Sequence, residues 1–280
     1  MCRLDQAGYG CGVATPLDRL HSVREQLIAD GAVVTPDGRL AEIFPVAIGP
    51  EEGAALRDHV VQAGATRTLE VGLGFAISTL FICEGLLVNG PGGRHVAIDP
   101  FQLEPGPGAR TTYAGVGLET LERAGVGDLV RLYQVESQVV LPRLLDEGQR
   151  FDLAFIDGNH RFEAVFLDLI YAGRLVAEGG VVFVDDTQLP AIRRARTSAP
   201  WNLAPLSTSA FRIAGSLPFS RARTSGSITE TPSPDRPVVY SFPSMRASER
   251  RYPTTLRPPW RSAFPLSRII PSTISRDSSG

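Results

Sequence analysis

The chain alternates short apolar runs with longer segments of helical periodicity. The apolar runs predict strands at 68–72, 94–99, 129–133 and 151–157, and the segment 179–186 predicts a glycine turn at Gly179-Gly180 followed by a fifth strand. Helical spacing and helix-start signals predict helices at 17–28, 50–62, 77–87, 118–123, 136–145 and 162–175, with the helix at 136–145 interrupted by Pro142. Strands that alternate with helices in this way predict an α/β fold with a doubly wound, mainly parallel sheet covered on both faces.

The stretch from Thr68 to Ile82 combines a strand, two glycines and an apolar helix. Gly72 and Gly74 have no Cβ and tolerate positive φ, so a ligand can approach the backbone closely at this turn. The helix that follows offers free N–H groups at its start. Glu70 ends the strand with a carboxylate, which disfavours a pyrophosphate and suits a ligand with an ammonium group and ribose hydroxyls.

Acidic residues follow four of the five predicted strands. They are Glu70, Asp99, Asp157, Asp185 and Asp186. In an open parallel sheet, ligands bind beyond the carboxyl ends of the strands, at the point where the strand order reverses. We therefore expect these carboxylates to converge on one crevice rather than to cap their strands separately.

Several of these motifs occur together in a known family. Glu70-Val-Gly-Leu-Gly74, His95-Val-Ala-Ile-Asp99, the run FDLAFIDGNH at 151–160, Asp168, and GGVVFVDD at 179–186 follow one another in the chain. This series resembles the class I S-adenosylmethionine (SAM)-dependent methyltransferases of the O-methyltransferase-like group, whose relatives include metal-dependent macrolide-sugar and catechol-type enzymes. The resemblance covers residues 45–195 and implies a Rossmann-like methyltransferase sheet. Ala76 departs from the family, which usually has a third glycine there.

The resemblance implies a SAM site. Glu70, Gly72, Gly74 and Ser78 would line its methionine end, and Asp157 would lie beside the reacting end. Asp99 would accept hydrogen bonds from both ribose hydroxyls, which suits a carboxylate. Ser137 would meet the adenine, with Glu136 as a rival for that contact.

The resemblance also implies a metal site and a base. Asp157, Asp185 and Asp186 match positions where metal-dependent relatives hold Mg²⁺, a hard cation that prefers carboxylate oxygens. Many relatives have Asn where this chain has Asp186. His160 stands where catechol-type relatives place a lysine, and its ordinary pKa suits a base. The catalytic residues expected are therefore His160 and Asp157, while Asn159 orients the substrate or caps the following helix.

The function implied is SAM-dependent O-methylation of a small hydroxylated metabolite with Mg²⁺ assistance. Tyr113, Phe101 and residues 17–50 are candidates for shaping the acceptor pocket. A non-catalytic or truncated methyltransferase remnant is one alternative. A nucleotide-binding oxidoreductase is another, disfavoured by Glu70 and because G-x-G-x-x-G would need a glycine in place of Ile77.

Composition changes abruptly near residue 195. Residues 1–194 hold 16 arginines against 26 acidic residues, whereas residues 195–280 hold 12 arginines against 4 acidic residues and are rich in Ser and Pro. We therefore divide the chain into an N-terminal cap segment (1–48), a SAM-binding domain (49–194) and a disordered tail (195–280). The last strands of the fold are not recognisable in this tail, and we hypothesise that the reading frame shifts near residue 195.

The remaining features of the sequence predict a cytoplasmic protein. Three irregularly spaced cysteines favour neither a disulfide framework nor a zinc site, and no apolar run suggests a signal peptide or membrane span. The partner expected is a small-molecule methyl acceptor rather than a membrane or nucleic acid. A homodimer stays open.

Overall fold

The computed structural model describes residues 15–36, 38–103, 113–199 and 238–241, the last of these for the backbone alone. The helices are α1 Pro16–Asp30, α2 Pro50–Gln62, α3 Ile77–Asn89, α4 Val116–Ala124, α5 Ser137–Asp146, α6 Phe162–Leu175 and α7 Pro190–Ser198. The strands are β1 Ala32–Val34, β2 Leu40–Glu42, β3 Arg67–Val71, β4 Arg94–Ile98, β5 Val130–Tyr133, β6 Phe151–Ile156, β7 Val176–Val184 and β8 Val238–Ser241. Among these residues, no helix has the length and apolar character needed to cross a bilayer.

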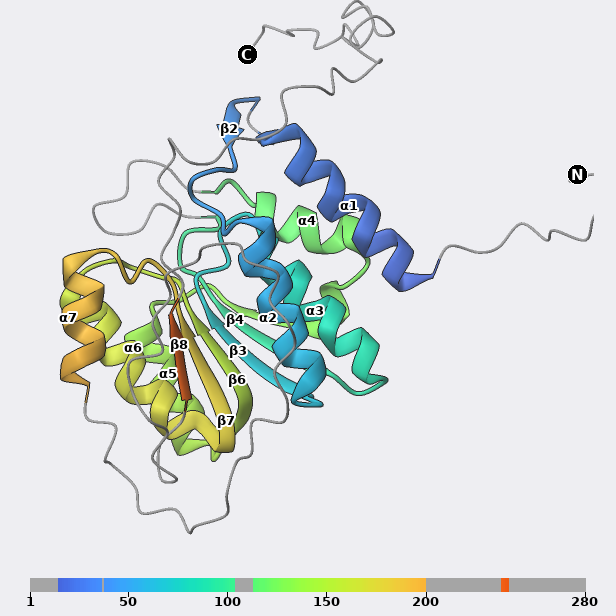
Figure 1. Ribbon diagram of the computed structural model, residues 1–280. Coiled ribbons are helices and arrows are strands. Elements are labelled where there is room, and N and C mark those ends of the chain that lie inside the picture. The colour runs from blue at the N-terminus through green and yellow to red at the C-terminus, as the bar shows by residue number, and fades with distance from the viewer. Residues whose placement is uncertain (1–14, 37, 104–112, 200–237, 242–280) are drawn as a thin grey trace, which may run out of the picture. The chain divides into compact units, whose positions relative to one another are not determined.

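A parallel sheet in the order β5-β4-β3-β6-β7-β8 forms the centre of the described part of the chain (Figure 1). The predicted α/β, doubly wound fold is confirmed. Val71, the last residue of β3, pairs with Ile98 of β4 on one side and Ile156 of β6 on the other. The strand order reverses between β3 and β6, so the loops after these strands leave in different directions and open a crevice at their carboxyl ends.

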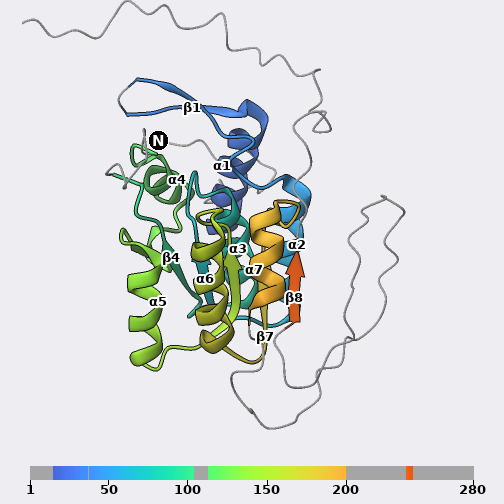
Figure 2. The same ribbon diagram turned by 90° about the vertical axis from the view of Figure 1, so that its left-hand side faces the viewer.

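Helices cover both faces of the sheet, and each face has its own apolar cluster. On one face, side chains of α1 to α4 pack against strand residues such as Leu153, Phe155 and Phe183. On the other, α5, α6 and α7 pack against alternate residues of the same strands, such as Ala154, Ile156 and Val182 (Figure 2). The two-residue alternation of strand side chains explains why these runs are apolar throughout.

The glycine pair before the last predicted strand lies inside a strand. The sequence predicts a turn at Gly179-Gly180, but β7 begins at Val176 and continues through both glycines. The pairing of β6 with β7 shifts register there, which marks a bulge. Gly179 has φ +77°, and a Cβ on Gly180 would lie 2.8 Å from the carbonyl oxygen of Asp152, so both positions need glycine.

Pro142 does not interrupt its helix, contrary to the sequence prediction. α5 continues from Ser137 to Asp146 with Pro142 inside it. A proline costs the helix one backbone hydrogen bond and crowds the preceding turn. The buried side chains of Val140, Leu141 and Leu144 hold this short helix against the sheet, so tertiary packing outweighs the local penalty.

Helical and strand structure extends beyond the boundary drawn at residue 195. α7 runs to Ser198, and β8 adds a strand parallel to β7, with Val181 opposite Val238. The remaining predictions for the tail concern residues that lie outside the described part of the chain.

The N-terminal helix α1 is joined to α3 through a mostly buried ion cluster. Arg24 of α1 bonds the carboxylate of Glu84 on α3 and stacks on the Phe81 ring at 4.0 Å. His21 Nε2 and Arg57 Nη1 lie 2.9 and 3.4 Å from Glu84 Oε1. Both Arg24 and Glu84 are buried, so each needs the other to compensate for lost hydration.

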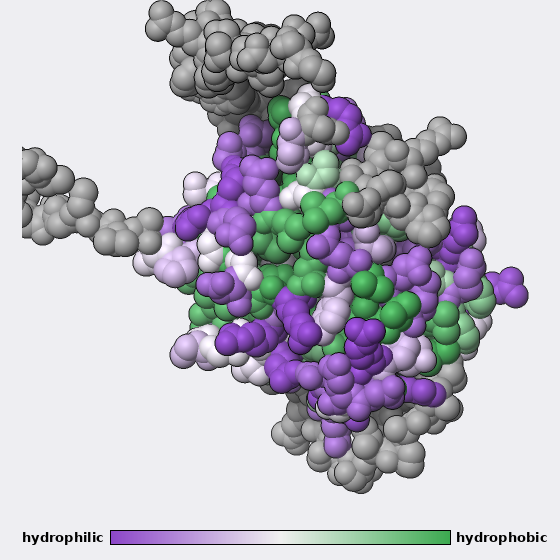
Figure 3. All heavy atoms as spheres, turned by 180° about the vertical axis from the view of Figure 1, so that it is seen from behind, coloured by the Kyte–Doolittle hydropathy of each residue, from purple (hydrophilic) through white to green (hydrophobic). Residues whose placement is uncertain are grey.

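Polar residues dominate the surface opposite to the view of Figure 1, with apolar side chains between them (Figure 3). Val34 and Leu40, two exposed apolar residues, lie opposite each other in the β1–β2 hairpin. A pair of exposed apolar side chains is ordinary on a folded protein.

Replacing Glu84 with Gln should destabilise the protein in a pH-dependent way. Burial raises the pKa of Glu84, but the hydrogen bonds and charges of Arg24 and His21 outweigh it and hold that pKa below its ordinary value. A lowered folded-state pKa gives stability that is present above the unfolded-state pKa and is lost as the pH falls through the folded one. We expect Glu84→Gln to cost about 3 kcal/mol near neutral pH, because it leaves Arg24 buried without its charge partner.

Urea denaturation near pH 7 and in the acid range measures this effect. The difference between wild type and Glu84→Gln should shrink as the pH falls, whereas the exposed Glu25→Gln should behave like wild type at each pH. An equally large difference at all pH values would show that the Glu84 charge does not stabilise the helix contact.

Candidate functional site

The turn after β3 packs directly against the loop after β6. Gly72 has φ +101°, and a Cβ there would lie 2.1 Å from the carbonyl oxygen of Asp157. Its N–H donates to the carbonyl of Ile98 at 2.9 Å, so the turn is fastened to β4 as well. Gly74 also has positive φ, as does Ala76, the N-cap of α3. The glycine pair is therefore required by backbone geometry, and it brings the predicted cofactor turn next to Asp157.

Glu70 is fully buried, with protein groups around its carboxylate. The hydroxyls of Ser78 and Thr79, in the first turn of α3, donate to its two oxygens. His95 Nε2 lies 3.1 Å from Oε2, and His95 Nδ1 lies 2.8 Å from the Thr68 hydroxyl. Glu70 thus ties the start of α3 to β3 and β4.

The roles expected of Glu70 and Ser78 at the methionine end of SAM stay predictions. In this structure the two side chains bond each other. Sequence reasoning did not identify Thr79 or His95 as part of this network. Thr68 and His95 are opposite each other in the β3–β4 register, which becomes visible only when the strand pairing is known.

Asp99 lies at the carboxyl end of β4 and is buried. Its Oδ2 accepts hydrogen bonds from the Gly74 N–H at 2.9 Å and from Gln102 Nε2 at 3.0 Å, and its Oδ1 accepts from the Phe101 N–H at 2.8 Å. A carboxylate offers about four acceptor positions, so one remains for a ligand hydroxyl. The structure brings this residue against the glycine turn, as a ribose-binding role requires.

Ser137 is the first residue of α5, and no side chain caps that helix start. It donates a hydrogen bond to Asp168 of α6, which is 1% exposed. Among the described residues, Asp168 Oδ1 has no hydrogen-bond partner. Asp168 also lies near Gly158 in the loop after β6. Ser137, the residue predicted to contact the adenine, is therefore held by Asp168, to which the sequence motif assigned no function.

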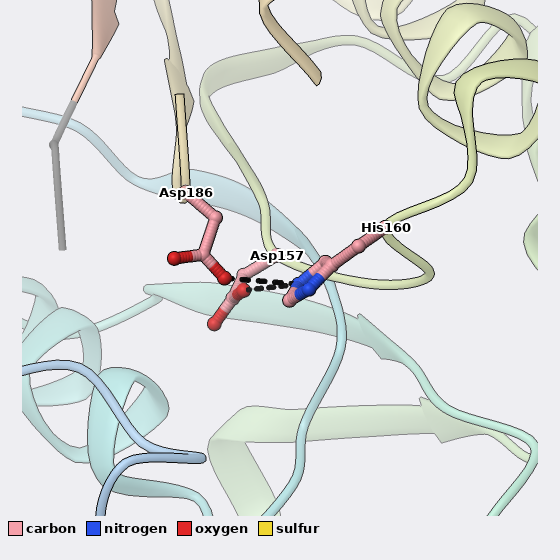
Figure 4. Close-up of side chains that lie close together, drawn as sticks. All are labelled: Asp157, His160 and Asp186. Atoms are coloured by element: carbon pink, nitrogen blue, oxygen red, sulfur yellow. Dashed lines mark ion pairs between the residues drawn. The ribbon is translucent and has the colours of Figure 1, made fainter. Parts of the chain in front are cut away.

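Asp157, His160 and Asp186 meet at the carboxyl ends of β6 and β7 (Figure 4). His160 Nε2 lies 3.5 Å from Asp157 Oδ1 and 3.3 Å from Asp186 Oδ2. One ligand atom of each residue lies within 4.8 Å of the others, which suits a metal ion. Asn159 Oδ1 accepts a hydrogen bond from the Arg161 N–H at 3.0 Å, so it supports the loop before α6.

Negative charge accumulates around this group. Burial, followed by the charges of Asp186, Glu70 and Glu52, raises the pKa of Asp157 well above its ordinary value. Burial, followed by the charges of Asp157 and Glu52, raises the pKa of Asp185 to about 9. Carboxylates so close together can all ionise only if a cation joins them.

The side chains here therefore suit a metal ion. The three that lie close together are Asp157, His160 and Asp186, whereas the sequence predicts Asp157, Asp185 and Asp186 as ligands. Asp185 lies beside the group but uses Oδ1 to accept the Asp186 N–H at 2.7 Å. Glu52 lies in the first turn of α2, and the sequence analysis did not assign it to the site. Its charge acts on Asp157 and Asp185 because α2 packs beside α3, and no local sequence motif predicts this contact.

Comparisons with known proteins agree with this geometry. Residues 69–187 match a family described as a methyltransferase domain. A putative O-methyltransferase from Mycolicibacterium vanbaalenii is 27% identical over 190 residues, covering 66% of this chain and 77% of its own. Residues 69–187 of the chain form a methyltransferase domain, and the chain is similar to putative O-methyltransferases.

Further relatives of this methyltransferase have similar names. A putative O-methyltransferase from Mycobacterium sp. strain JLS is 29% identical, covering 57% of this chain and 66% of its own. An O-methyltransferase from Bacillus cereus, crystallised with SAH, is 20% identical, covering 67% of this chain and 78% of that one at a TM-score of 0.46. At that score the structural overlap has no weight of its own, and the assignment rests on the sequence matches.

The matched range contains the glycine turn of this methyltransferase and every strand-end acid described above, from Glu70 to Asp186. Glu52 lies outside it. The family match thus includes both sides of the crevice between β3 and β6. The contact that each residue makes with SAM stays a prediction.

Asp168 should make the methyltransferase less stable as the pH rises. Burial raises its pKa to about 6 from an ordinary 3.8, although the Ser137 hydrogen bond opposes this shift. Since the folded protein holds this proton more tightly than the unfolded chain, the stabilisation is present at low pH and lost as the pH rises through 6. Between about pH 4.5 and about pH 7.5 the shift corresponds to about 2 kcal/mol.

Asp168→Asn removes this titration and keeps the side-chain shape. Denaturation across that range should show wild type losing about 2 kcal/mol relative to Asp168→Asn as the pH rises. Asp146→Asn, an exposed residue of α5, serves as the control and should follow wild type. A constant offset between wild type and Asp168→Asn would contradict the prediction.

Proposed function

We propose that this protein transfers the methyl group of SAM to a hydroxyl oxygen of a small metabolite, with Mg²⁺ at the acidic strand ends. The observation that carries the proposal is the contact of Gly72 with the Asp157 carbonyl. It joins a turn suited to SAM and a cluster suited to a cation and a hydroxyl within one crevice.

The cofactor half of the proposal assigns roles along the carboxyl ends of β3, β4 and β5. Gly72 and Gly74 leave room for the methionine part. Asp99 accepts one ribose hydroxyl through its remaining acceptor position, rather than both as the sequence predicts, because protein groups occupy the other three. Ser137, held by Asp168, contacts the adenine. Glu70 and Ser78 support the cofactor site by fixing the start of α3 through their hydrogen bond.

The acceptor half uses the acids after β6 and β7. Asp157, Asp185 and Asp186 would hold Mg²⁺ through oxygen ligands, the donor type that this ion prefers. Bound there, the ion would lower the pKa of an acceptor hydroxyl and balance the acids. His160 remains the base: half-exposed and beside Asp157 and Asp186, it can take the hydroxyl proton and keep it as imidazolium between two carboxylates.

The chemistry needs no covalent enzyme intermediate. SAM supplies an electrophilic methyl group, whose bond to sulfur breaks as the bond to the acceptor oxygen forms. The crevice contributes by holding the two reactants in line, with the oxygen about 3 Å from the methyl carbon, and by accepting the proton. Asp157, His160 and Asp186 follow β6 and β7, on the other side of β3 from Asp99 of β4, and this arrangement supports an acceptor at their end of the crevice.

Thermal unfolding with SAM tests the cofactor half. A ligand at about 100 times its dissociation constant stabilises the folded state by about 2.7 kcal/mol, which is an easily detected shift. We expect SAM to raise the melting temperature of the full chain and NADH to leave it unchanged. A cooperatively folded protein that responds to NADH alone would favour the oxidoreductase, and one that responds to neither would favour the non-catalytic remnant.

Adding Mg²⁺ to the SAM-bound protein tests the metal half. We expect a further stabilisation that Asp157→Ala and Asp185→Ala abolish and that the exposed Asp146→Ala leaves intact. His160→Ala should retain the Mg²⁺ shift while losing methyl transfer. Loss of the shift in His160→Ala with retention in Asp185→Ala would contradict the proposed ligands and assign the imidazole to the metal.

A further inference from the structure

The ring of Tyr113 lies over the glycine turn, at a place where the proposed cofactor would pass. A Cβ on Gly74 would meet the Cε1, Cζ and hydroxyl of Tyr113, each at 3.9 Å. The Tyr113 ring also packs edge-on against Phe75, with centroids 5.2 Å apart and planes at 81°. Any ligand that lies against the bare side of Gly74 therefore also touches this ring.

Backbone bonds hold Tyr113 in this position. Its N–H donates to the carbonyl of Phe101 at 2.9 Å, and its carbonyl accepts from the Val116 N–H at the start of α4 at 3.0 Å. Phe101 is itself bonded to the Asp99 carboxylate. The ring is thus connected to the residue assigned to the ribose.

Tyr113 lies between the two functional acids. The Asp99 carboxylate accepts the N–H of Gly74, and the Asp157 carbonyl packs against Gly72, two residues before it. The surroundings of the phenol agree with this position, because burial and then the charges of Asp99 and Asp157 raise the pKa of Tyr113 to about 12. The phenol consequently stays protonated and neutral at physiological pH.

The chemistry of SAM determines what belongs between these acids. Its sulfur joins the ribose to the methionine chain and carries the methyl group that goes to the acceptor. If Asp99 marks the ribose and Asp157 the acceptor, the group between them faces the positively charged sulfonium. The face of an aromatic ring attracts such a cation, and more strongly where water is excluded.

We propose that the aromatic ring of Tyr113 binds the sulfonium of SAM over Gly74 and thereby distinguishes SAM from its neutral product SAH. This inference rests on the proposed function, since it needs SAM in the crevice. It assigns a specificity role to a residue that the sequence offered only as a candidate for the acceptor pocket. Binding the charged cofactor more tightly than the neutral product also favours product release.

Calorimetric titration of the full chain with SAM and with SAH tests the role of Tyr113. Tyr113→Leu keeps apolar bulk but removes the ring, and it should weaken SAM binding about tenfold, the factor that corresponds to about 1.4 kcal/mol. Its affinity for SAH should change less than about threefold, since the thioether carries no charge. Tyr113→Phe keeps the ring and should bind both ligands like wild type.

Matched variants separate this role from a general loss of structure. Tyr171→Leu, which removes a half-buried α6 ring that packs against the apolar cluster on the opposite face of the sheet from α3, should leave the ratio of SAM to SAH affinity unchanged. Should Tyr113→Leu fail to fold cooperatively, Tyr113→Met provides the same comparison. Equal weakening of both ligands, or loss of SAM preference in Tyr113→Phe, would overturn the proposal.

The two levels of inference fail differently. Wild-type protein that binds neither SAM nor SAH would refute the proposed function itself. Wild-type protein that binds both, with a ratio that Tyr113→Leu does not alter, would refute only the sulfonium role of Tyr113.

Discussion

The contact between Gly72 and the Asp157 carbonyl is the constraint on which the rest of the site depends. At this point the turn after β3 and the loop after β6 touch backbone to backbone, and a Cβ on Gly72 would lie only 2.1 Å from the Asp157 carbonyl oxygen. Because the strand order reverses between β3 and β6, the two loops then diverge. The close approach therefore fixes the floor of the crevice, with the cofactor turn on one side and the acids of β6 and β7 on the other.

Buried polar groups support this floor from both faces. Glu70 connects β3 with the first turn of α3 and with His95 of β4, while Asp168 connects α6 with the start of α5. Burying carboxylates is costly unless their oxygens have partners. Both Glu70 oxygens accept hydrogen bonds, whereas Asp168 Oδ1 has no partner among the described residues and the pKa of Asp168 is raised to about 6. Glu70 and Asp168 thus hold the starts of α3 and α5 at the crevice. In this role the two acids position other groups and do not touch the reacting atoms.

The acids at the ends of β6 and β7 have the opposite character. Burial, followed by the charges of neighbouring acids, raises the pKa values of Asp157 and Asp185, so full ionisation of this group would require a nearby cation. Glu52 of α2 contributes further negative charge. A bound cation or a protonated His160 imidazole would offset this negative charge, and both therefore support the proposed role of this end of the crevice.

The sequence by itself determined the order and type of the five central strands β3 to β7 and of helices α1 to α6, the glycine turn and the acids at the strand ends, but not β1, β2 or α7. These features are local, because apolar runs, helical spacing and glycines that tolerate positive φ can be recognised from neighbouring residues alone. It did not reveal the bulge at Gly179, the continuous helix through Pro142, or the strand at 238–241, since packing and pairing with distant strands decide them. Only the tertiary structure placed Thr79 and His95 on Glu70, Glu52 beside Asp157, and the ring of Tyr113 over Gly74. Each of these contacts joins residues whose proximity depends on strand order and helix packing, and that information is not contained in any single stretch of the chain.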